Sequence, residues 1–262
     1  MSRAERNDLS QMANKVPEVT IWFWIIKIMA TTVGETAADL LSIRLDLGLT
    51  VTSYMMTAVF ILALIIQVKT RRYVPSLYWL TVVLISIVGT LISDNLVDGM
   101  GVSLVTTSIA FGLILAVVFA LWYRTEKTLS IHSIVTTRRE LFYWAAILFT
   151  FAMGTSVGDL LAETLDLGYA QAALAFATMI GAIAVLHYIV RLDAILSFWL
   201  AYILTRPLGA SIGDWLAKPV IAGGLGWGTV TTSLIFLAVI FLVVIYLSVS
   251  KPDRISRAPS EV

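Results

Sequence analysis

Four aspartates occupy the same place in a repeated pattern, and carboxylates are the side chains best suited to holding a hard cation. Each copy of the pattern is an aromatic residue followed by Trp, a Gly ten residues after that Trp, and an Asp five residues after the Gly. The repeated acids are Asp39, Asp94, Asp159 and Asp214. All-oxygen ligand sets favour Mg²⁺, Mn²⁺, Ca²⁺ or protons. We therefore predict a cation site built from these four acids, with Glu35 as a further oxygen ligand.

A simpler interpretation is that the four aspartates are solvated turn residues at helix ends. The constant spacing from Gly to Asp argues against it, because loop carboxylates need no fixed register. An Asp near a helix C-terminus also opposes the helix dipole by about 0.3–1 kcal/mol, a penalty that a bound cation would reverse. Asp46 and Asp166 differ from the repeated acids, since each precedes an apolar segment and is expected to cap a helix N-terminus.

Other polar residues share a helix face with the repeated acids. At about 100° per residue, the positions seven, eleven and fifteen residues after each Trp lie within a stripe roughly 80° wide. The polar members inside the acid layer that could line a path are Thr31, Ser86, Thr90, Thr155 and Arg206. A polar stripe on apolar helices should face an interior path or cavity. The hydroxyls could equally bond the backbone one turn back, and both interpretations stay open.

Arg206 and Glu35 break the fourfold symmetry of the stripe. A lone Arg in an apolar core costs about 2.5–3.5 kcal/mol on membrane-insertion scales, so it needs a partner. Glu35 lies one layer further out and can meet Arg206 if the first and seventh helices are adjacent. The pair is then either a structural ion pair, or Arg206 is an internal cation that competes with a substrate cation for the acids.

The remaining members of the pattern have structural explanations. We expect the four Trp residues to anchor the helices at a membrane interface. Lys27, near the same end of its helix, should extend its amine to that surface. The repeated Gly residues should let neighbouring helices approach closely.

The elements that position these residues follow from composition. The chain has 262 residues, of which 59% are hydrophobic and 13% charged, and its mean hydropathy is +0.90. These values indicate an all-α integral membrane protein. A spanning helix needs about 20 apolar residues. Eight stretches qualify as transmembrane helices: 17–42, 45–68, 73–96, 101–123, 138–162, 167–190, 193–216 and 226–249.

The repeat length equals two spans, so all four copies of the pattern point the same way across the bilayer. Leu45-Asp46-Leu47-Gly48 recurs as Leu165-Asp166-Leu167-Gly168, which indicates two tandem four-helix halves, each made of two helical hairpins in a pseudo-fourfold arrangement. The predicted divisions are a cytoplasmic N-terminal tail (1–16), the first four-helix repeat (17–123), a basic cytoplasmic linker (124–137), the second repeat (138–249) and a cytoplasmic C-terminal tail (250–262).

Lys and Arg are concentrated in the two tails, the linker and alternate loops, which places both termini in the cytoplasm. No room remains for a soluble catalytic or nucleic-acid-binding domain. The chain has no Cys, no Gly-rich phosphate loop and no nucleophile–base pair, so we expect neither an enzyme nor a cofactor, apart from a bound divalent cation. The expected partners are the lipid bilayer and a small inorganic cation, and the oligomeric state stays open.

The segment Lys15–Thr20, followed by Phe23-Trp24 and by Thr31–Asp39, resembles a bacterial family labelled only as uncharacterised membrane-anchored proteins. The resemblance implies a bacterial inner-membrane location and carries no established activity. The polar stripe itself predicts a small secondary transporter for a hard cation, and crowded carboxylates offer a route to proton coupling. The alternative is a non-transporting membrane sensor, assembly factor or complex subunit with a structural ion site.

Overall fold

The structure is a computed structural model that describes residues 14–253; the outer parts of both predicted tails, 1–13 and 254–262, lie outside the described residues. Eight long helices account for most of this chain: α2 (Ile21–Asp39), α3 (Leu49–Lys69), α4 (Pro75–Asp94), α5 (Leu104–Glu126), α6 (Thr137–Asp159), α7 (Tyr169–Ile189), α8 (Ala194–Ala217) and α9 (Thr229–Ser250). Each overlaps one of the eight predicted apolar stretches along most of its length. The short elements are three π-helical turns, η1 (Leu40–Arg44), η2 (Asn95–Gly99) and η4 (Leu160–Thr164), and two 3₁₀ turns, η3 (Ile131–Ser133) and η5 (Val220–Ala222).

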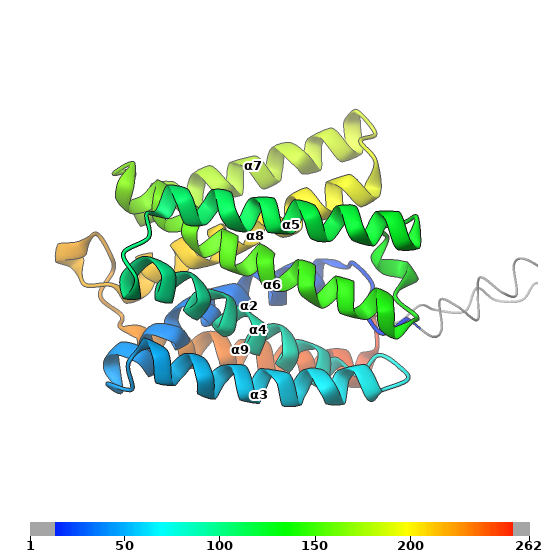
Figure 1. The fold of residues 1–262 in the computed structure, drawn as a ribbon, viewed down its shortest axis with the longest axis horizontal. Coiled ribbons are helices and arrows are strands. Elements are labelled where there is room, and N and C mark those ends of the chain that lie inside the picture. The colour runs from blue at the N-terminus through cyan, green and yellow to red at the C-terminus, as the bar shows by residue number, and fades with distance from the viewer. Residues whose placement is uncertain (1–13, 254–262) are drawn as a thin grey trace, which may run out of the picture.

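The four helices that carry the repeated pattern form a closed inner ring. Helix α2 packs against α4, α4 against α6, α6 against α8, and α8 against α2. The other four helices surround this ring, and each packs against the inner helix that follows it in the chain: α3 on α4, α5 on α6, α7 on α8 and, closing the circle, α9 on α2. The two sets run nearly parallel along the long axis of the molecule (Figure 1).

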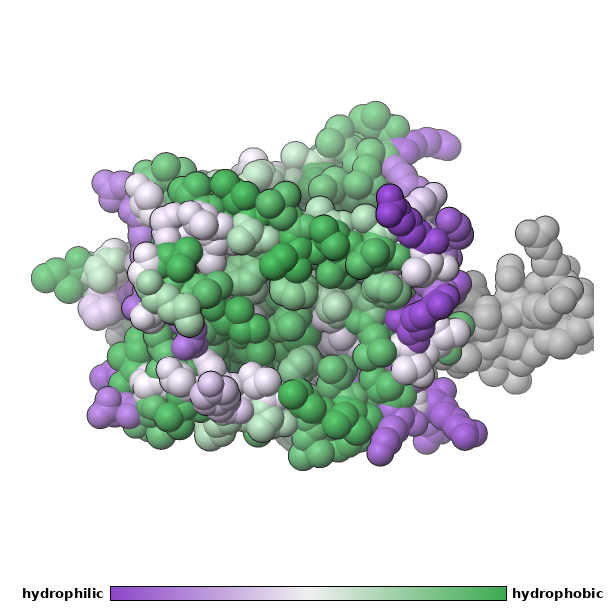
Figure 2. All heavy atoms as spheres, in the orientation of Figure 1, coloured by the Kyte–Doolittle hydropathy of each residue, from purple (hydrophilic) through white to green (hydrophobic). Residues whose placement is uncertain are grey.

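Burial separates the two sets of helices. In the apolar windows of α4, α6 and α8, 56–67% of residues are buried, against 17–22% in α3, α5, α7 and α9. Seven helices of the described chain are long and apolar enough to cross a membrane, and α2 falls short because it carries Lys27, Glu35 and Asp39. On the face that Figure 2 shows, apolar residues cover the middle of the molecule and hydrophilic residues lie at both ends. These features are compatible with a multi-pass membrane protein.

The described parts of both termini lie at one end of the bundle, together with the α3–α4, α5–α6 and α7–α8 connections (Figure 1). The backbone N–H of Glu18 donates to the carbonyl of Asp253 at 3.1 Å. Lys15 is buried, and its Nζ donates to Glu140 Oε2 at 2.7 Å and to the Val68 carbonyl at 2.8 Å. Residues 14–16, the last part of the predicted N-terminal tail, are therefore packed into the fold.

Two expectations about local roles need correction. Trp79, Trp144 and Trp199 are only 1–4% exposed and pack on neighbouring aromatic rings inside the bundle, so they do not anchor a surface, whereas Trp24 is half-buried. Asp46 and Asp166 do not cap helices. They adopt left-handed backbone conformations, with φ of 54° and 55°, while the glycines two residues later occupy the N-cap positions of α3 and α7. A tight reversal after the π-helical turns, not capping, explains these two acids.

Candidate cation site

The inner helices place side chains on the axis of the ring in layers four residues apart. Each layer contains the residues that follow the four repeated Trp residues by the same number of positions. The layer three positions after Trp contains Lys27, Val82, Ile147 and Tyr202, and the layer seven positions after it contains Thr31, Ser86, Phe151 and Arg206. The layer eleven positions after Trp contains Glu35, Thr90, Thr155 and Ala210, and the layer fifteen positions after it contains the four aspartates. All twelve residues of the first three layers are at most 5% exposed. The predicted stripe thus faces the interior of the ring, as expected from helical geometry.

The repeated glycines hold the ring together by a cyclic fit. Each Gly receives the seventh-position residue of the next inner helix around the ring, and a Cβ at the Gly would overlap that side chain. The four pairs are Gly34 with Ser86, Gly89 with Phe151, Gly154 with Arg206, and Gly209 with Thr31. The packing role predicted for these glycines is confirmed, and it explains why the distance from Trp to Gly is constant.

Arg206 occupies the axis at the level of its layer. Its Nη2 donates to Glu35 Oε2 at 3.0 Å, to Thr155 Oγ1 at 2.7 Å and to Thr90 Oγ1. These three acceptors are the polar members of the next layer outward. The predicted pairing of Arg206 with Glu35 is therefore present, and it follows from the contact between α2 and α8. The guanidinium has no exposed surface, and its Nε and Nη1 have no hydrogen-bond partner among the described residues.

The stripe hydroxyls play both roles that the sequence left open. Thr31 Oγ1 donates to the Ile28 carbonyl at 2.7 Å, Thr90 to the Ser86 carbonyl at 3.1 Å, and Thr155 to the Phe151 carbonyl at 3.2 Å. Thr90 and Thr155 also accept from Arg206, so they face the axis while bonding their own backbone. Ser86 Oγ is buried without a hydrogen-bond partner among the described residues.

The repeated aspartates lie just outside the ion pair, at one end of the ring. Asp39, Asp94 and Asp159 are each the last residue of an α-helix that continues into a π-helical turn, a feature often found at functional sites. All three are half-buried, and Asp214 is 3% exposed. The four carboxyls occupy equivalent positions of the inner helices, one layer outward from Glu35.

The acids do not form a compact ligand set. Within residues 14–253, no three His, Cys, Asp or Glu side chains lie close enough together to hold one metal ion. The Nζ of Lys218 lies 3.5 Å from Asp214 Oδ2 and 3.2 Å from Glu163 Oε1, and it donates to the Tyr169 hydroxyl at 3.0 Å. Burial opposes the charge on Lys218, but these neighbours raise its pKa above the usual value.

Lys218 thus neutralises one repeated acid. No Lys or Arg of the described chain pairs with the other three, Asp39, Asp94 and Asp159. Cation binding by the four aspartates and Glu35 stays a prediction.

Sequence reasoning missed an aromatic clamp around Lys27, which does not reach the surface as expected. Lys27 is fully buried, and its Nζ lies 4.1 Å from the centre of the Phe151 ring and 4.2 Å from that of Tyr202. The two rings are nearly parallel, with centres 6.3 Å apart. The four-residue spacing of the stripe, continued one step inward from Thr31, already placed Lys27 on the axis and was the signal that could have located it.

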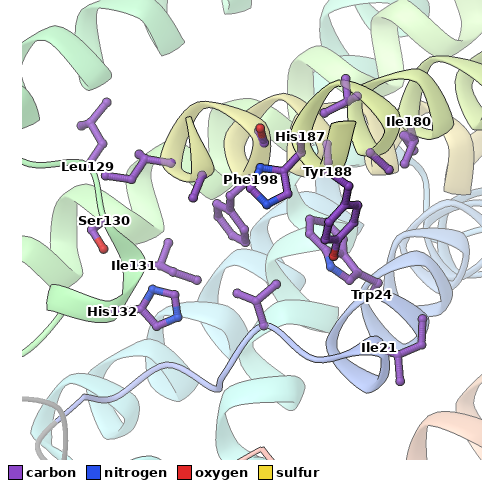
Figure 3. Close-up of a pocket in the computed structure, with 17 residues that line it drawn as sticks. Ile21, Trp24, Leu129, Ser130, Ile131, His132, Ile180, His187, Tyr188 and Phe198 are labelled. Carbon is purple, nitrogen blue, oxygen red and sulfur yellow. The ribbon is translucent and has the colours of Figure 1, made fainter. Parts of the chain in front are cut away.

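A separate groove of about 590 Å³ lies outside the ring, between α2, α7, α8 and the α5–α6 connection. Figure 3 shows Trp24, His187, Tyr188 and Phe198 gathered on one side of it and Ser130 and His132 on the other. His187 Nδ1 contacts the Leu192 carbonyl at 2.9 Å, and His132 Nε2 lies 3.3 Å from Glu18 Oε2. Both histidines are therefore tied to nearby protein groups, remote from the layered axis.

The unit of the fold is one inner helix and the outer helix that follows it. Four segments match a family model described as a repeat of unknown function, DUF347: residues 22–73, 77–128, 142–193 and 197–253. The chain belongs to this family. Each DUF347 repeat therefore contributes one Gly, one seventh-position side chain and one Asp to the ring. No curated protein and no solved structure matches the chain.

Proposed function

We propose that this DUF347 protein is a small secondary transporter for a hard cation, with Mn²⁺, Mg²⁺ and Ca²⁺ as the candidate substrates. The observation that carries the proposal is the buried Arg206–Glu35 ion pair on the axis, directly inside the level of the four aspartates. The acids attract a cation to the end of the ring, and Arg206 holds the place that the cation would take beside Glu35.

The mechanism follows from competition between two cations for one carboxylate. A substrate cation bound among Asp39, Asp94 and Asp159 competes with Arg206 for the Glu35 carboxylate and so weakens the ion pair between Arg206 and Glu35. Arg206 already donates to Thr90 and Thr155, so it can keep two hydrogen bonds when Glu35 turns to the cation. An Arg cannot lose its proton in a protein, which makes it a permanent tethered cation that closes the axis whenever the substrate leaves.

The proposal includes a location. We place all eight helices across a bacterial inner membrane, with the basic end and both termini in the cytoplasm, by the positive-inside rule. The acidic end then faces outward. The proposal also keeps the two tandem halves, and the near-identical reversals at Asp46–Gly48 and Asp166–Gly168 support them. Proton exchange would supply the energy for cation movement.

Purified protein in liposomes tests the transport proposal. We expect Mn²⁺, Mg²⁺ or Ca²⁺ to cross faster than in protein-free liposomes, and Asp159→Asn to slow the movement at least about tenfold, the effect of losing about 1.4 kcal/mol of binding. Asp46→Asn is the matched control, because Asp46 is exposed at the same end and Asn tolerates its left-handed backbone. If both variants slowed the movement equally, the repeated aspartates would not form the cation site.

A non-transporting role as a sensor, assembly factor or complex subunit is the second candidate. The dispersed placement of the acids favours it, because no three of them in the described chain could hold one metal together. The tightly packed aromatic layer at the basic end of the axis favours it as well. Liposomes that pass none of the three cations, with unchanged metal content in cells lacking the protein, would support this role.

A further inference from the structure

Lys27 is a buried cation with no anionic partner. Its side chain has no exposed surface, and Nζ makes no hydrogen bond or ion pair with any described residue. Only the faces of Phe151 and Tyr202 hold the amine. Arg206, one layer outward, is a second buried cation whose charge acts on Lys27. With both groups charged, two cations share the single carboxylate of Glu35.

This environment suits a group that gains and releases a proton. Aromatic faces stabilise a desolvated ammonium by about 2 kcal/mol, less than an ion pair with hydrogen bonds would. Lysine, unlike arginine, changes its protonation state readily when buried. The core therefore pairs a cation of fixed charge, Arg206, with one whose charge can be removed.

The elements around Lys27 present few other titratable groups. Helix α8 supplies Arg206 and Tyr202 to the clamp, and α6 supplies the uncharged ring of Phe151 across the axis. Helix α4 carries Tyr78 and Asp94 near its two ends. Tyr246, on α9, packs against Trp22 with ring centres 5.1 Å apart. Asp94 belongs to the outward acid layer, and the ring of Tyr202 is in direct contact with the Lys27 amine, 4.2 Å from its centre.

Tyrosine hydroxyls continue from the clamp toward the basic end. The buried Tyr202 hydroxyl is a neighbour of the Tyr143 hydroxyl and has no hydrogen-bond partner in the described structure. Tyr143 and Tyr78 share a hydrogen bond of 2.5 Å between their hydroxyls. The Tyr78 ring packs edge-on against Tyr73, whose hydroxyl donates to Asp253 Oδ2 at 2.6 Å where the described chain ends.

We propose that Lys27 carries the coupled proton of this transporter and exchanges it with the basic end through Tyr202, Tyr143 and Tyr78. The inference rests on the proposed transport function and names its counter-ion. In release, the Lys27 ammonium gives one proton to the Tyr202 oxygen, Tyr202, Tyr143 and Tyr78 each pass their own proton onward, and the last proton passes by way of Tyr73 to the Asp253 carboxylate at the basic end. Every tyrosine ends neutral, Lys27 has lost one proton and Asp253 has gained one. The lost charge offsets the charge that a substrate cation brings to Glu35.

Two measurements on liposomes separate coupling from transport. Exchange of labelled for unlabelled Mn²⁺ at equal pH on both sides needs only the cation path, whereas proton movement driven by a Mn²⁺ gradient, followed with a pH dye, needs the proton carrier. Lys27→Arg keeps the charge and cannot release a proton. We expect it to retain exchange and lose proton movement. Proton movement at the wild-type ratio to Mn²⁺ in Lys27→Arg would overturn the proposal.

Matched controls exclude general damage. Lys69→Arg alters an exposed lysine at the end of α3 and should leave both measurements unchanged. Tyr202→Phe keeps the aromatic face but removes the hydroxyl, so it should slow proton movement more than Mn²⁺ exchange. Tyr188→Phe, at an exposed position of α7, should slow neither.

A spectroscopic measurement tests Lys27 without transport. In protein labelled at lysine Cε, the NMR signal that disappears in Lys27→Arg should change its chemical shift as the pH is varied across the range in which the protein stays folded. A signal that stays constant over this range would overturn the proposal. If wild-type protein exchanges no Mn²⁺ while Lys27 still titrates, the transport proposal and the coupling role fail together, and only the change of protonation at Lys27 is confirmed.

Discussion

Arg206 and Glu35 show how one buried ion pair can be required without adding much net stability. Removing both charges from water costs several kcal/mol per ion, and their mutual attraction roughly repays that cost. Arg206 also has two hydroxyl acceptors, Thr90 and Thr155, which satisfy part of the guanidinium. Removing one partner of the pair should therefore lower the stability strongly, whereas replacing both partners by uncharged residues should change it little.

A double-mutant cycle tests this at the residue scale. Glu35→Gln leaves a buried Arg without its anion and should lower the free energy of unfolding by about 3–5 kcal/mol. Arg206→Met in the same chain should recover most of that loss, because no unpaired charge remains. Unfolding of the detergent-solubilised variants measures both effects. Additive losses, within about 0.5 kcal/mol, would mean that the two side chains do not interact.

Within the inner helices, one Gly per helix sets the spacing of the ring. The seventh-position residue of one helix fits the Gly of its neighbour, and the same contact occurs four times around the axis. The side chains that pack against the four glycines differ in size, from Ser86 to Arg206. The glycines therefore keep the helix backbones close together whichever residues occupy the seventh position. Fourfold packing and an asymmetric polar axis are thereby compatible.

Alanine substitution tests the glycine contacts. A Cβ at Gly209 would overlap Thr31 and approach the Thr32 backbone, so Gly209→Ala should destabilise the protein by about 1–3 kcal/mol. Gly181, in outer helix α7, has no atom within 4 Å of an added Cβ. Gly181→Ala should stabilise the protein by about 0.5–1 kcal/mol, because alanine loses less backbone entropy. Thermal unfolding of the two variants in detergent measures the contrast, and equal effects would contradict the cyclic fit.

The whole molecule has two hydrophilic ends, separated on the face that Figure 2 shows by an apolar band. The repeated aspartates lie at the acidic end, where Lys218 pairs with Asp214. The described parts of the termini and three connections lie at the other end, which holds most of the loop Lys and Arg residues. This asymmetry gives the molecule a defined direction, and the orientation proposed above, with the basic end in the cytoplasm, rests on the positive-inside rule.

Reporter fusions test the direction. Fusions after residues 100 and 218, in the connections at the acidic end, should report the outside, and a fusion after residue 130 should report the cytoplasm. The α5–α6 connection lies at the basic end because the Lys15 N–H donates to the Ile134 carbonyl at 3.3 Å. A reporter after residue 130 found outside would reverse the orientation and turn the acids toward the cytoplasm.

The expected helices and their interior face depended on short-range patterns. The apolar stretches located the helices because a helix is specified by residues within a few turns of one another. The four-residue spacing placed Arg206 and Glu35 on the axis for the same reason. Trp79, Trp144 and Trp199 were misjudged, since an aromatic ring can lie at an interface or in a core, and the sequence alone does not distinguish the two.

The sequence by itself determined the repeat, the apolar helices, the clustering of basic residues and the alignment of the acids on one helix face. These features depend on composition and on a periodicity set by local backbone geometry. Only the tertiary structure decided that α9 closes on α2, that each Gly receives a side chain from the next inner helix, and that Lys27 lies between Phe151 and Tyr202. Such contacts join residues far apart in the chain, so they form only when the four inner helices pack into a closed ring and their side chains fill its interior.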